Sequence, residues 1–342
     1  MKKLKASMRS DLTLTILVFF TIAILVFLAI TLGPKVYNGR NFQSMAFQIS
    51  EFAVLAFGMG LAMLLGGIDL SIVANANLSG IMCAFVLSNA AIVASLGDGA
   101  TIAIAVIVAL VVGTVGGLFN GFLIAKCSVH PIVATLGTMT LYNGISTAST
   151  GGNGVSGFPK AFTNLGVATV SGVPVLFIIF MVLAIIVIFV MTYTGFGKKI
   201  YMIGENHTAA RFSAINNEKC IMIIYAMAGF LAGVSGIMIS ARVNSSKVGY
   251  GDTYQLQAIL VAVLAGISPS GGKGKMAGIL LALACTQILQ SAFTVWQFTP
   301  YSKKLIWGVM LLAMLFVNKI IDYLDTQKQK QLLDLQLAQD AE

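Results

Sequence analysis

Long runs of apolar residues recur along the whole chain, separated by short polar stretches. Folded as a helix, about 20 apolar residues match the ~30 Å hydrocarbon layer of a membrane. Helices satisfy their own backbone polar groups in lipid, whereas a barrel would need alternating segments of about 10 residues, which do not recur here. The pattern predicts an all-α polytopic membrane protein with about ten transmembrane helices. Their expected positions are 13–32, 44–65, 70–89, 100–125, 131–149, 173–192, 220–241, 253–267, 276–293 and 305–321.

Two polar breaks interrupt otherwise continuous apolar stretches, GGIDLS (66–71) and GISPSGGKG (266–274). Glycine frees the backbone and proline stops helices, so each break predicts a broken or re-entrant helix. Such a break is tolerated against protein or a watery cavity but not against lipid. LGGI (65–68) and LAGI (264–267) resemble each other, which hints at an internal repeat of the kind that transporters contain.

The distribution of Lys and Arg predicts which side each loop faces. With the N-terminus inside, twice as many of the 21 Lys and Arg residues fall on cytoplasmic segments and their flanks as outside. This orientation places residues 1–12, the long loop 193–219 and the polar tail 322–342 in the cytoplasm, and the loop 150–172 outside. Both breaks fall on the cytoplasmic side. Residues 13–321 then form one transmembrane domain, followed by a solvated tail or an amphipathic helix.

Composition and motifs exclude several classes of function. The chain is 58% hydrophobic and 10% charged, far from a soluble domain, and the positive-inside rule explains its net charge of +9 better than a nucleic-acid partner does. The nearest match to a phosphate-binding loop, GGKGK (271–275), lacks the upstream glycine and the hydroxyl residue after the lysine. The two histidines have no carboxylate cluster beside them. We therefore expect no enzymatic activity, no metal site and no cofactor bound by this chain.

Two acidic residues lie within the apolar stretches. Asp69 follows the first break and is placed to cap the next helix, with a substrate or gating role as the alternative. Glu51 lies about two turns inside the second predicted span, where an unpaired charge would cost ~3 kcal/mol or more. It should therefore face a cavity, a polar neighbour or a partner subunit. No basic residue lies in a neighbouring span centre, so an ion relay has little support.

Uncharged polar residues are frequent within the predicted spans. They can act as hydrogen-bonding contacts between helices, which is the usual role of Ser, Thr and Asn in membrane bundles. They can also line a pathway, which would suit a neutral, hydroxyl-rich solute better than an ion. The candidate residues for such a translocation path are Glu51, Asp69, Ser71, Asn75, Asn120, Thr135 and Thr138.

The polar stretch GENHTAARFSAINNEK (204–219) separates two long apolar runs. Its composition predicts a short helix capped by Asn206 or Thr208, with small alanines on one face and charges from Glu205 and Arg211. It is either a surface helix without a partner or a knob that fits a cleft on a separate cytoplasmic protein. The second interpretation suits a transporter that contains no motor of its own.

Five motifs resemble the permease subunits of bacterial ATP-binding-cassette importers of the ribose, galactose and xylose type. The resemblance covers about residues 41–321. The motifs are GMGLAMLLGGIDLS (58–71), NGFLIAKCSVHPIVATLGTMTLYNG (120–144), YMIGENHTAARFSAIN (201–216), YAMAGFLAGVSGIMISAR (225–242) and AILVAVLAGISPSGGKGKMAG (258–278).

The resemblance implies that the stretch around residue 204 is the cytoplasmic coupling helix that the ATPase subunit grips. The matching residues are Gly204, Glu205, Asn206, Ala209, Ala210 and Arg211. The chain departs from the family at Ala214, where glycine is usual, and at Pro269 in the second break. Glu51 occupies a position that is more often apolar, which points to this protein's own solute preference or to an assembly contact.

The resemblance also implies the partners and the setting. These are a second permease copy or paralogue, an ATPase that binds ATP and Mg, and an external solute-binding protein, in the bacterial inner membrane with both termini cytoplasmic. The expected cargo is a monosaccharide or similar polyol, and the sequence does not name it. The alternatives are an ion-coupled secondary transporter of a small neutral solute and a membrane scaffold or intramembrane enzyme.

Overall fold

The computed structural model describes residues 17–19, 21–33 and 37–339, with side chains described up to residue 320. The predicted N-terminal segment 1–12 therefore lies outside the described residues, and so do the first residues of the predicted span 13–32. The described part of that span belongs to an apolar helix over Leu17–Thr31.

The described chain is predominantly helical, with only two-residue strands, which confirms the predicted class. The helices are α2 (Gly39–Leu64), α3 (Ile72–Leu87), α4 (Ala90–Ala125), α5 (Pro131–Thr150), α6 (Lys160–Val167), α7 (Val175–Tyr193), α8 (Gly195–Glu205), α9 (His207–Phe212), α10 (Asn217–Val243), α11 (Asp252–Leu264), α12 (Gly278–Val295) and α13 (Pro300–Gln339). Each predicted span coincides with a helix over its described residues. Among the described residues, α2, α4, α7, α10 and α12 are long and apolar enough to cross a membrane alone. The tail is helical through Gln339, as part of α13.

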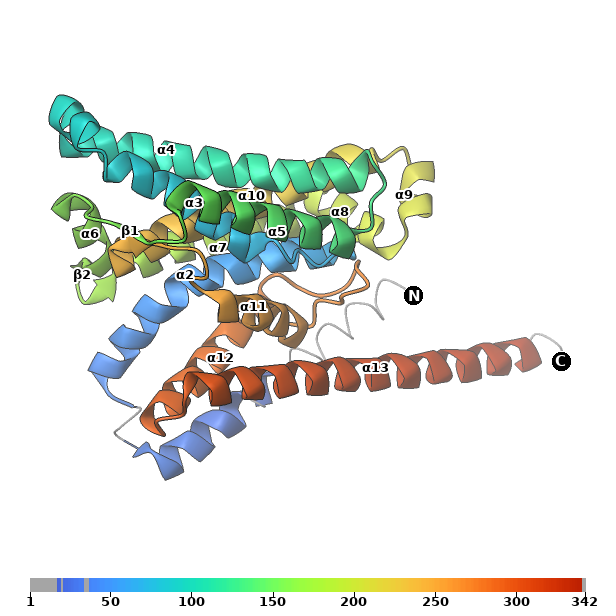
Figure 1. Ribbon diagram of the computed structural model, residues 1–342. Helices are drawn as coiled ribbons and strands as arrows, with labels where there is room; N and C mark the ends of the chain where they lie inside the picture. The colour runs from blue at the N-terminus through green and yellow to red at the C-terminus, as the bar shows by residue number, and fades with distance from the viewer. Residues whose placement is uncertain (1–16, 20, 34–36, 340–342) are drawn as a thin grey trace.

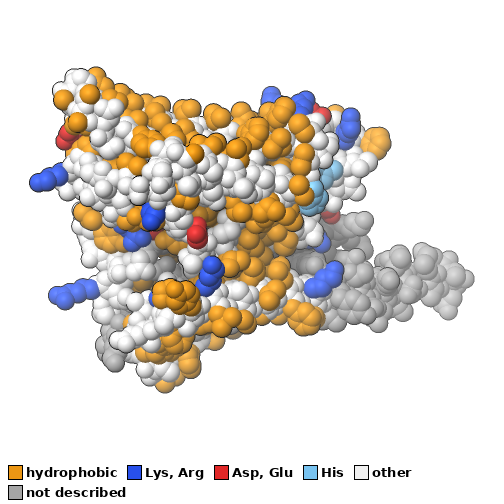
Figure 2. All heavy atoms as spheres, in the orientation of Figure 1, with side chains coloured by type: hydrophobic (Ala, Val, Ile, Leu, Met, Phe, Trp, Pro, Cys, Tyr) orange, Lys and Arg blue, Asp and Glu red, His pale blue; other side chains and the backbone are white. Residues whose placement is uncertain are grey.

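The long helices run back and forth between two ends of the molecule (Figure 1). One end carries α8 and α9, and the other carries α6 with two short strand pairs. There β1 (Val155–Ser156) pairs with β4 (Ser245–Ser246), and β2 (Thr169–Val170) pairs with β3 (Val173–Pro174). The loops 150–172 and 193–219 thus lie at opposite ends, as the sequence predicts. Figure 2 shows apolar side chains over much of the surface between these ends, as lipid contact requires.

Glycines allow the central helices α4 and α10 to pack backbone against backbone. A Cβ at Gly113 would lie 2.5 Å from the Gly229 carbonyl oxygen, and a Cβ at Gly117 would lie 2.1 Å from that of Tyr225. Small residues at four-residue spacing permit such close approach in membrane helices. α10 also packs against α2 and α3, so it forms the centre of the bundle.

The two predicted breaks begin with the same backbone geometry. After α2, Gly66 adopts φ +79° and its amide donates to the Met63 carbonyl. After α11, Gly266 adopts φ +80° and its amide donates to the Val263 carbonyl in the same way. Glycine at a left-handed position after the last helical turn is the usual way to end a helix. The similarity of LGGI and LAGI therefore has a structural basis at the start of each break.

Candidate coupling helix and buried polar sites

Asn206 separates α8 from α9 and caps the second helix. Its side-chain oxygen accepts hydrogen bonds from the Thr208 and Ala209 amides, both at 2.9 Å. Its own amide donates to the Met202 carbonyl in the last turn of α8. The predicted short helix is confirmed, with Asn206 rather than Thr208 as its cap. The preceding helix α8 was not predicted, because its glycine-rich sequence reads as a turn.

α9 attaches to the protein by one face and presents the other to solvent. Ala210 is buried, whereas Ala209 and Arg211 are exposed and Phe212 is 89% exposed. The helix ends at Phe212, and Ala214, two residues later, adopts a left-handed φ of +57°. This conformation favours glycine, so the departure at this position leaves the bend in place and adds local strain.

A cavity of about 830 Å³ lies beside α9. Its walls come from α9, the α4–α5 connection, the start of α10 and the first break, including Gly66 and Gly67. The Tyr225 hydroxyl, also at the cavity, is buried without a hydrogen-bond partner among the described residues. At its rim Glu218 pairs with Lys126 at the end of α4. The coupling stretch around α9 therefore does not pack directly against the first break and the α4–α5 connection, because the cavity lies between them.

Most of the candidate path residues form one buried hydrogen-bonded cluster. Asp69 accepts from the Ser71 amide at 2.9 Å and from the Ser71 hydroxyl at 2.7 Å. The Asn120 side-chain amide donates to the Ser71 hydroxyl at 2.7 Å. The Thr138 hydroxyl in turn donates to the Asn120 carbonyl oxygen at 2.6 Å. The cluster therefore joins the first break to α4 and α5.

Two further candidates lie next to this cluster. The Thr135 hydroxyl donates to the Ile68 carbonyl at 3.0 Å, which fixes α5 to the first break. The Asn75 amide donates to the Gly113 carbonyl at 2.9 Å, while its side-chain oxygen has no partner among the described residues. All these side chains are buried within one chain. This geometry agrees with contacts between helices, and the path role stays a prediction.

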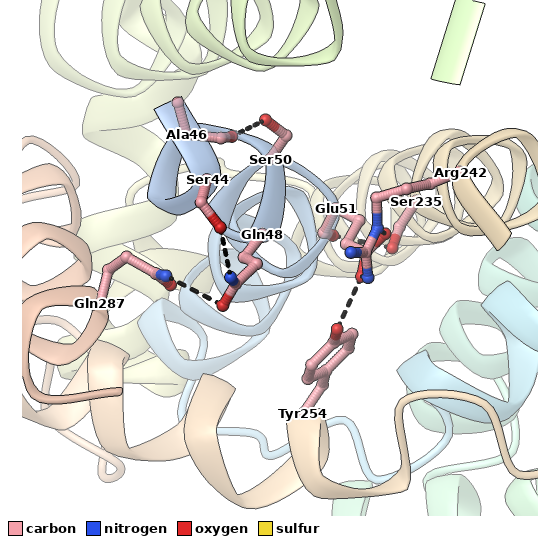
Figure 3. Close-up of polar contacts among 9 residues, drawn as sticks. All are labelled: Ser44, Ala46, Gln48, Ser50, Glu51, Ser235, Arg242, Tyr254 and Gln287. Carbon is pink, nitrogen blue, oxygen red and sulfur yellow. Dashed lines mark hydrogen bonds and ion pairs between the residues drawn. The ribbon is translucent and has the colours of Figure 1, made fainter. Parts of the chain in front are cut away.

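Glu51 lies apart from this cluster and has a charged partner (Figure 3). Its carboxylate is 1% exposed and accepts two hydrogen bonds from the Arg242 guanidinium, at 2.8 and 2.5 Å. The Tyr254 hydroxyl donates to the same carboxylate at 2.6 Å, and the Ser235 hydroxyl donates to the Glu51 backbone carbonyl at 2.8 Å. The expected polar neighbour therefore belongs to the same chain.

The sequence did not reveal Arg242 as that neighbour. It lies in the last turn of α10, and the distribution of Lys and Arg assigned it to the external side of the membrane. Its long side chain reaches back to Glu51 on α2, as Arg side chains near helix ends do. The available signal was a single Arg near the end of a span and a single Glu in another.

Among the described residues, no group of three or more His, Cys, Asp or Glu could hold a metal ion.

Comparison with known proteins adds an independent line of evidence. The family described as "Branched-chain amino acid transport system / permease component" matches residues 41–315. The ribose import permease protein of Bacillus subtilis is 31% identical over 304 residues, covering 88% of this chain and 91% of that protein. The Escherichia coli K12 ribose import permease protein is 33% identical over 87% of this chain and 92% of its own length. The D-allose transport system permease protein of the same strain is 30% identical, with 89% and 91% covered. No solved structure matches the chain.

Proposed function

The chain belongs to the family of permease components of branched-chain amino acid transport systems, and we propose that it is the membrane subunit of an ATP-driven importer of a monosaccharide or similar polyol. The similarity to sugar import permeases, which extends over nearly the whole length of both chains, carries this proposal. The sugar names of these relatives favour a sugar over a branched-chain amino acid.

The buried acids argue against the ion-coupled alternative. Glu51 is neutralised by Arg242, and Asp69 accepts two hydrogen bonds from Ser71. Ion-coupled transporters usually carry ionisable residues that face a cavity or a pathway. In the described chain, both acids instead have partners from the protein itself.

The exposed α9 supports docking of a separate ATPase that binds ATP and Mg. Its small alanines, its exposed Arg211 and its exposed Phe212 form a compact knob held in place by the Asn206 cap. An aromatic and an Arg at the centre of a small surface are the residue types that dominate binding energies. In this arrangement the end with α9 faces the cytoplasm, and so does the end of α13 at Gln339 (Figure 1). The solute-binding protein contacts the opposite end.

The outer face of α5 supports a second permease subunit. A Cβ at Gly137 or Gly144 would meet no described atom within 4 Å. These glycines share an exposed face with Thr140 and Thr147. Val133, Leu136 and Leu141 are exposed on the same side of the helix. A largely apolar face with small and hydroxyl-bearing positions suits either close helix packing or contact with a polyol. We place the solute path at this face, between two permease copies or between this chain and a paralogue.

The proposal is tested by reversing one charge on α9. Arg211→Glu should weaken association with the ATPase by about tenfold, because it places a like charge in a surface complementary to Arg. Lys160→Glu, at the start of α6 on the opposite end, is the matched control and should leave association unchanged. Affinity is measured by titrating the purified ATPase onto each variant in nanodiscs. Equal affinities for both variants would contradict the docking role.

Transport itself is tested in proteoliposomes that contain the permease, its ATPase and its binding protein. Uptake of labelled ribose, allose, galactose and xylose should require internal ATP and should continue without an ion gradient. Uptake driven by a gradient in the absence of the ATPase would establish the secondary transporter instead.

A further inference from the structure

The two breaks and the end of α8 meet through their backbones, although they are far apart in the sequence. The Gly272 amide, in the second break, donates a 2.9 Å hydrogen bond to the carbonyl of Leu64, the last residue of α2. Gly204, in the last turn of α8, lies against the same two residues. One hydrogen bond thus joins the two broken hairpins at the point where α8 contacts both.

These backbones lie so close together that a Cβ atom on the glycines would overlap neighbouring backbone atoms. A Cβ at Gly204 would lie 2.0 Å from the Leu64 oxygen and 2.4 Å from the Gly272 nitrogen. A Cβ at Gly272 would lie 2.5 Å from the Glu205 nitrogen, and one at Gly271 would lie 2.7 Å from the Gly204 oxygen. Cβ atoms essentially never come within 3.0 Å of such atoms, so only glycine fits at these positions.

The backbone conformation of the two breaks also requires glycine. Gly66, Gly271 and Gly272 adopt φ values of +79°, +86° and +69°, where other residues are strained. The Gly271 amide donates to the Ser268 carbonyl at 3.0 Å, which closes a turn with Pro269 as its second residue, the position that proline favours. The unusual proline therefore pre-forms the turn that carries Gly271 to α8. We refer to Gly66, Gly204, Gly271 and Gly272 as the glycine joint.

The glycine joint connects the exposed coupling segment to the buried sites. On one side, Asn206 links α8 to α9 by hydrogen bonds to both helices. On the other side, Leu64 ends the helix that carries Glu51, and the first break carries Asp69. The Gln255 side chain on α11 donates to the Asp69 carbonyl at 3.2 Å, a second link between the hairpins. The end of α8 is therefore in backbone contact with both hairpins.

We propose that the glycine joint transmits movement of α8 and α9 to both broken hairpins at once, so that nucleotide-driven movement reaches α2–α3 and α11–α12 together. The inference rests on the proposed function, because the ATPase supplies the movement. The joint glycines act as positioning residues. They hold three backbones in contact, where any side chain would separate them.

The first test compares two glycines of the same helix. Gly204→Ala should lower the solute imported per ATP hydrolysed by about tenfold, with both rates measured on the complex that the variant forms with the ATPase. Gly195→Ala, at the first position of α8, is the control, since a Cβ there would meet no described atom within 4 Å. Equal import per ATP in the two variants would overturn the joint. Failure of the unaltered chain to bind the ATPase would refute the proposed function instead.

A second pair separates contact from backbone strain. Gly272→Ala should uncouple import from hydrolysis, whereas Gly152→Ala, with a similar φ of +77° and no atom within 4 Å, should not.

Hydrogen exchange on the unaltered complex tests the joint without any variant. A non-hydrolysable ATP analogue should change exchange in 265–277 and 65–71 together with 195–212. A response confined to 195–212 would overturn the proposal even if the alanine variants do not fold.

Discussion

Glu51 and Asp69 are both buried acids, but their partners differ in kind. Glu51 on α2 is held by Arg242 from α10 and Tyr254 from α11, so its interactions join three helices. Asp69 is held by the backbone and hydroxyl of Ser71, two residues away. The first acid stabilises the arrangement of the bundle, and the second stabilises one turn and the start of one helix.

The difference shows how a carboxylate is retained inside a membrane protein. A buried charge is tolerated only with a partner and additional hydrogen bonds. Glu51 obtains a bidentate pair and a phenol, which is the stronger class of charged interaction. Asp69 obtains two short local bonds at a helix N-terminus, where the helix dipole also favours a negative group. Removal of partners should therefore have a much larger effect around Glu51.

The largest effect is expected for Arg242→Met, which leaves the Glu51 carboxylate buried with Tyr254 as its remaining donor. Breaking a buried pair from one side costs about 3–5 kcal/mol, and the 30% exposure of the Arg242 side chain places this case near ~3 kcal/mol. Thermal unfolding in detergent measures the change. The double variant Glu51→Gln/Arg242→Met should recover most of the loss. If both forms lose stability equally, packing of the Arg stem rather than the charge is responsible.

A smaller effect is expected for Tyr254→Phe, which removes one donor and leaves the ion pair intact. A hydrogen bond to a charged group contributes about 1.5–3 kcal/mol, so a loss of about 2 kcal/mol should follow. The Tyr250 hydroxyl bonds to Ser245 in β4, between uncharged groups. Tyr250→Phe is therefore the control and should cost less than about 1 kcal/mol. Equal losses would mean that the carboxylate does not strengthen the Tyr254 bond.

Much of the fold follows from the pattern of apolar runs. Period, length and the Gly/Pro breaks place the described part of every predicted span on a helix, because lipid leaves the chain few other conformations. Less local features do not appear in the pattern. The left-handed backbone at Gly97 inside α4 is one example, and α8, which precedes the Asn206 cap, is another. Neither follows from the apolar period.

The candidate sites also differ in whether their partners are close or distant in the sequence. The Asn206 cap was predictable, because its partners lie within three residues. Asp69 was predicted to cap the next helix, but Ser71 is the N-cap of α3, and Asp69 instead accepts both of its hydrogen bonds from Ser71 just before the helix. The Glu51–Arg242 pair spans 191 positions, and no single sequence reveals which helices pack together. The glycine joint is similar. GGK in the second break and GEN in the coupling stretch are visible in the sequence, but their contact depends on how α8 lies across both hairpins.

The smallest effect in this comparison is expected at Asp69, and it also separates the two interpretations of that residue. Asp69→Ala removes an acceptor that caps the Ser71 amide, which should cost about 1 kcal/mol. Asp69→Asn keeps a side-chain oxygen in the same place and should cost only a few tenths of a kcal/mol. If Asp69 is structural, import per folded molecule stays unchanged in both variants. If the residue contacts solute or controls a gate, Asp69→Asn lowers import without lowering the unfolding temperature, because the charge is lost while the turn persists.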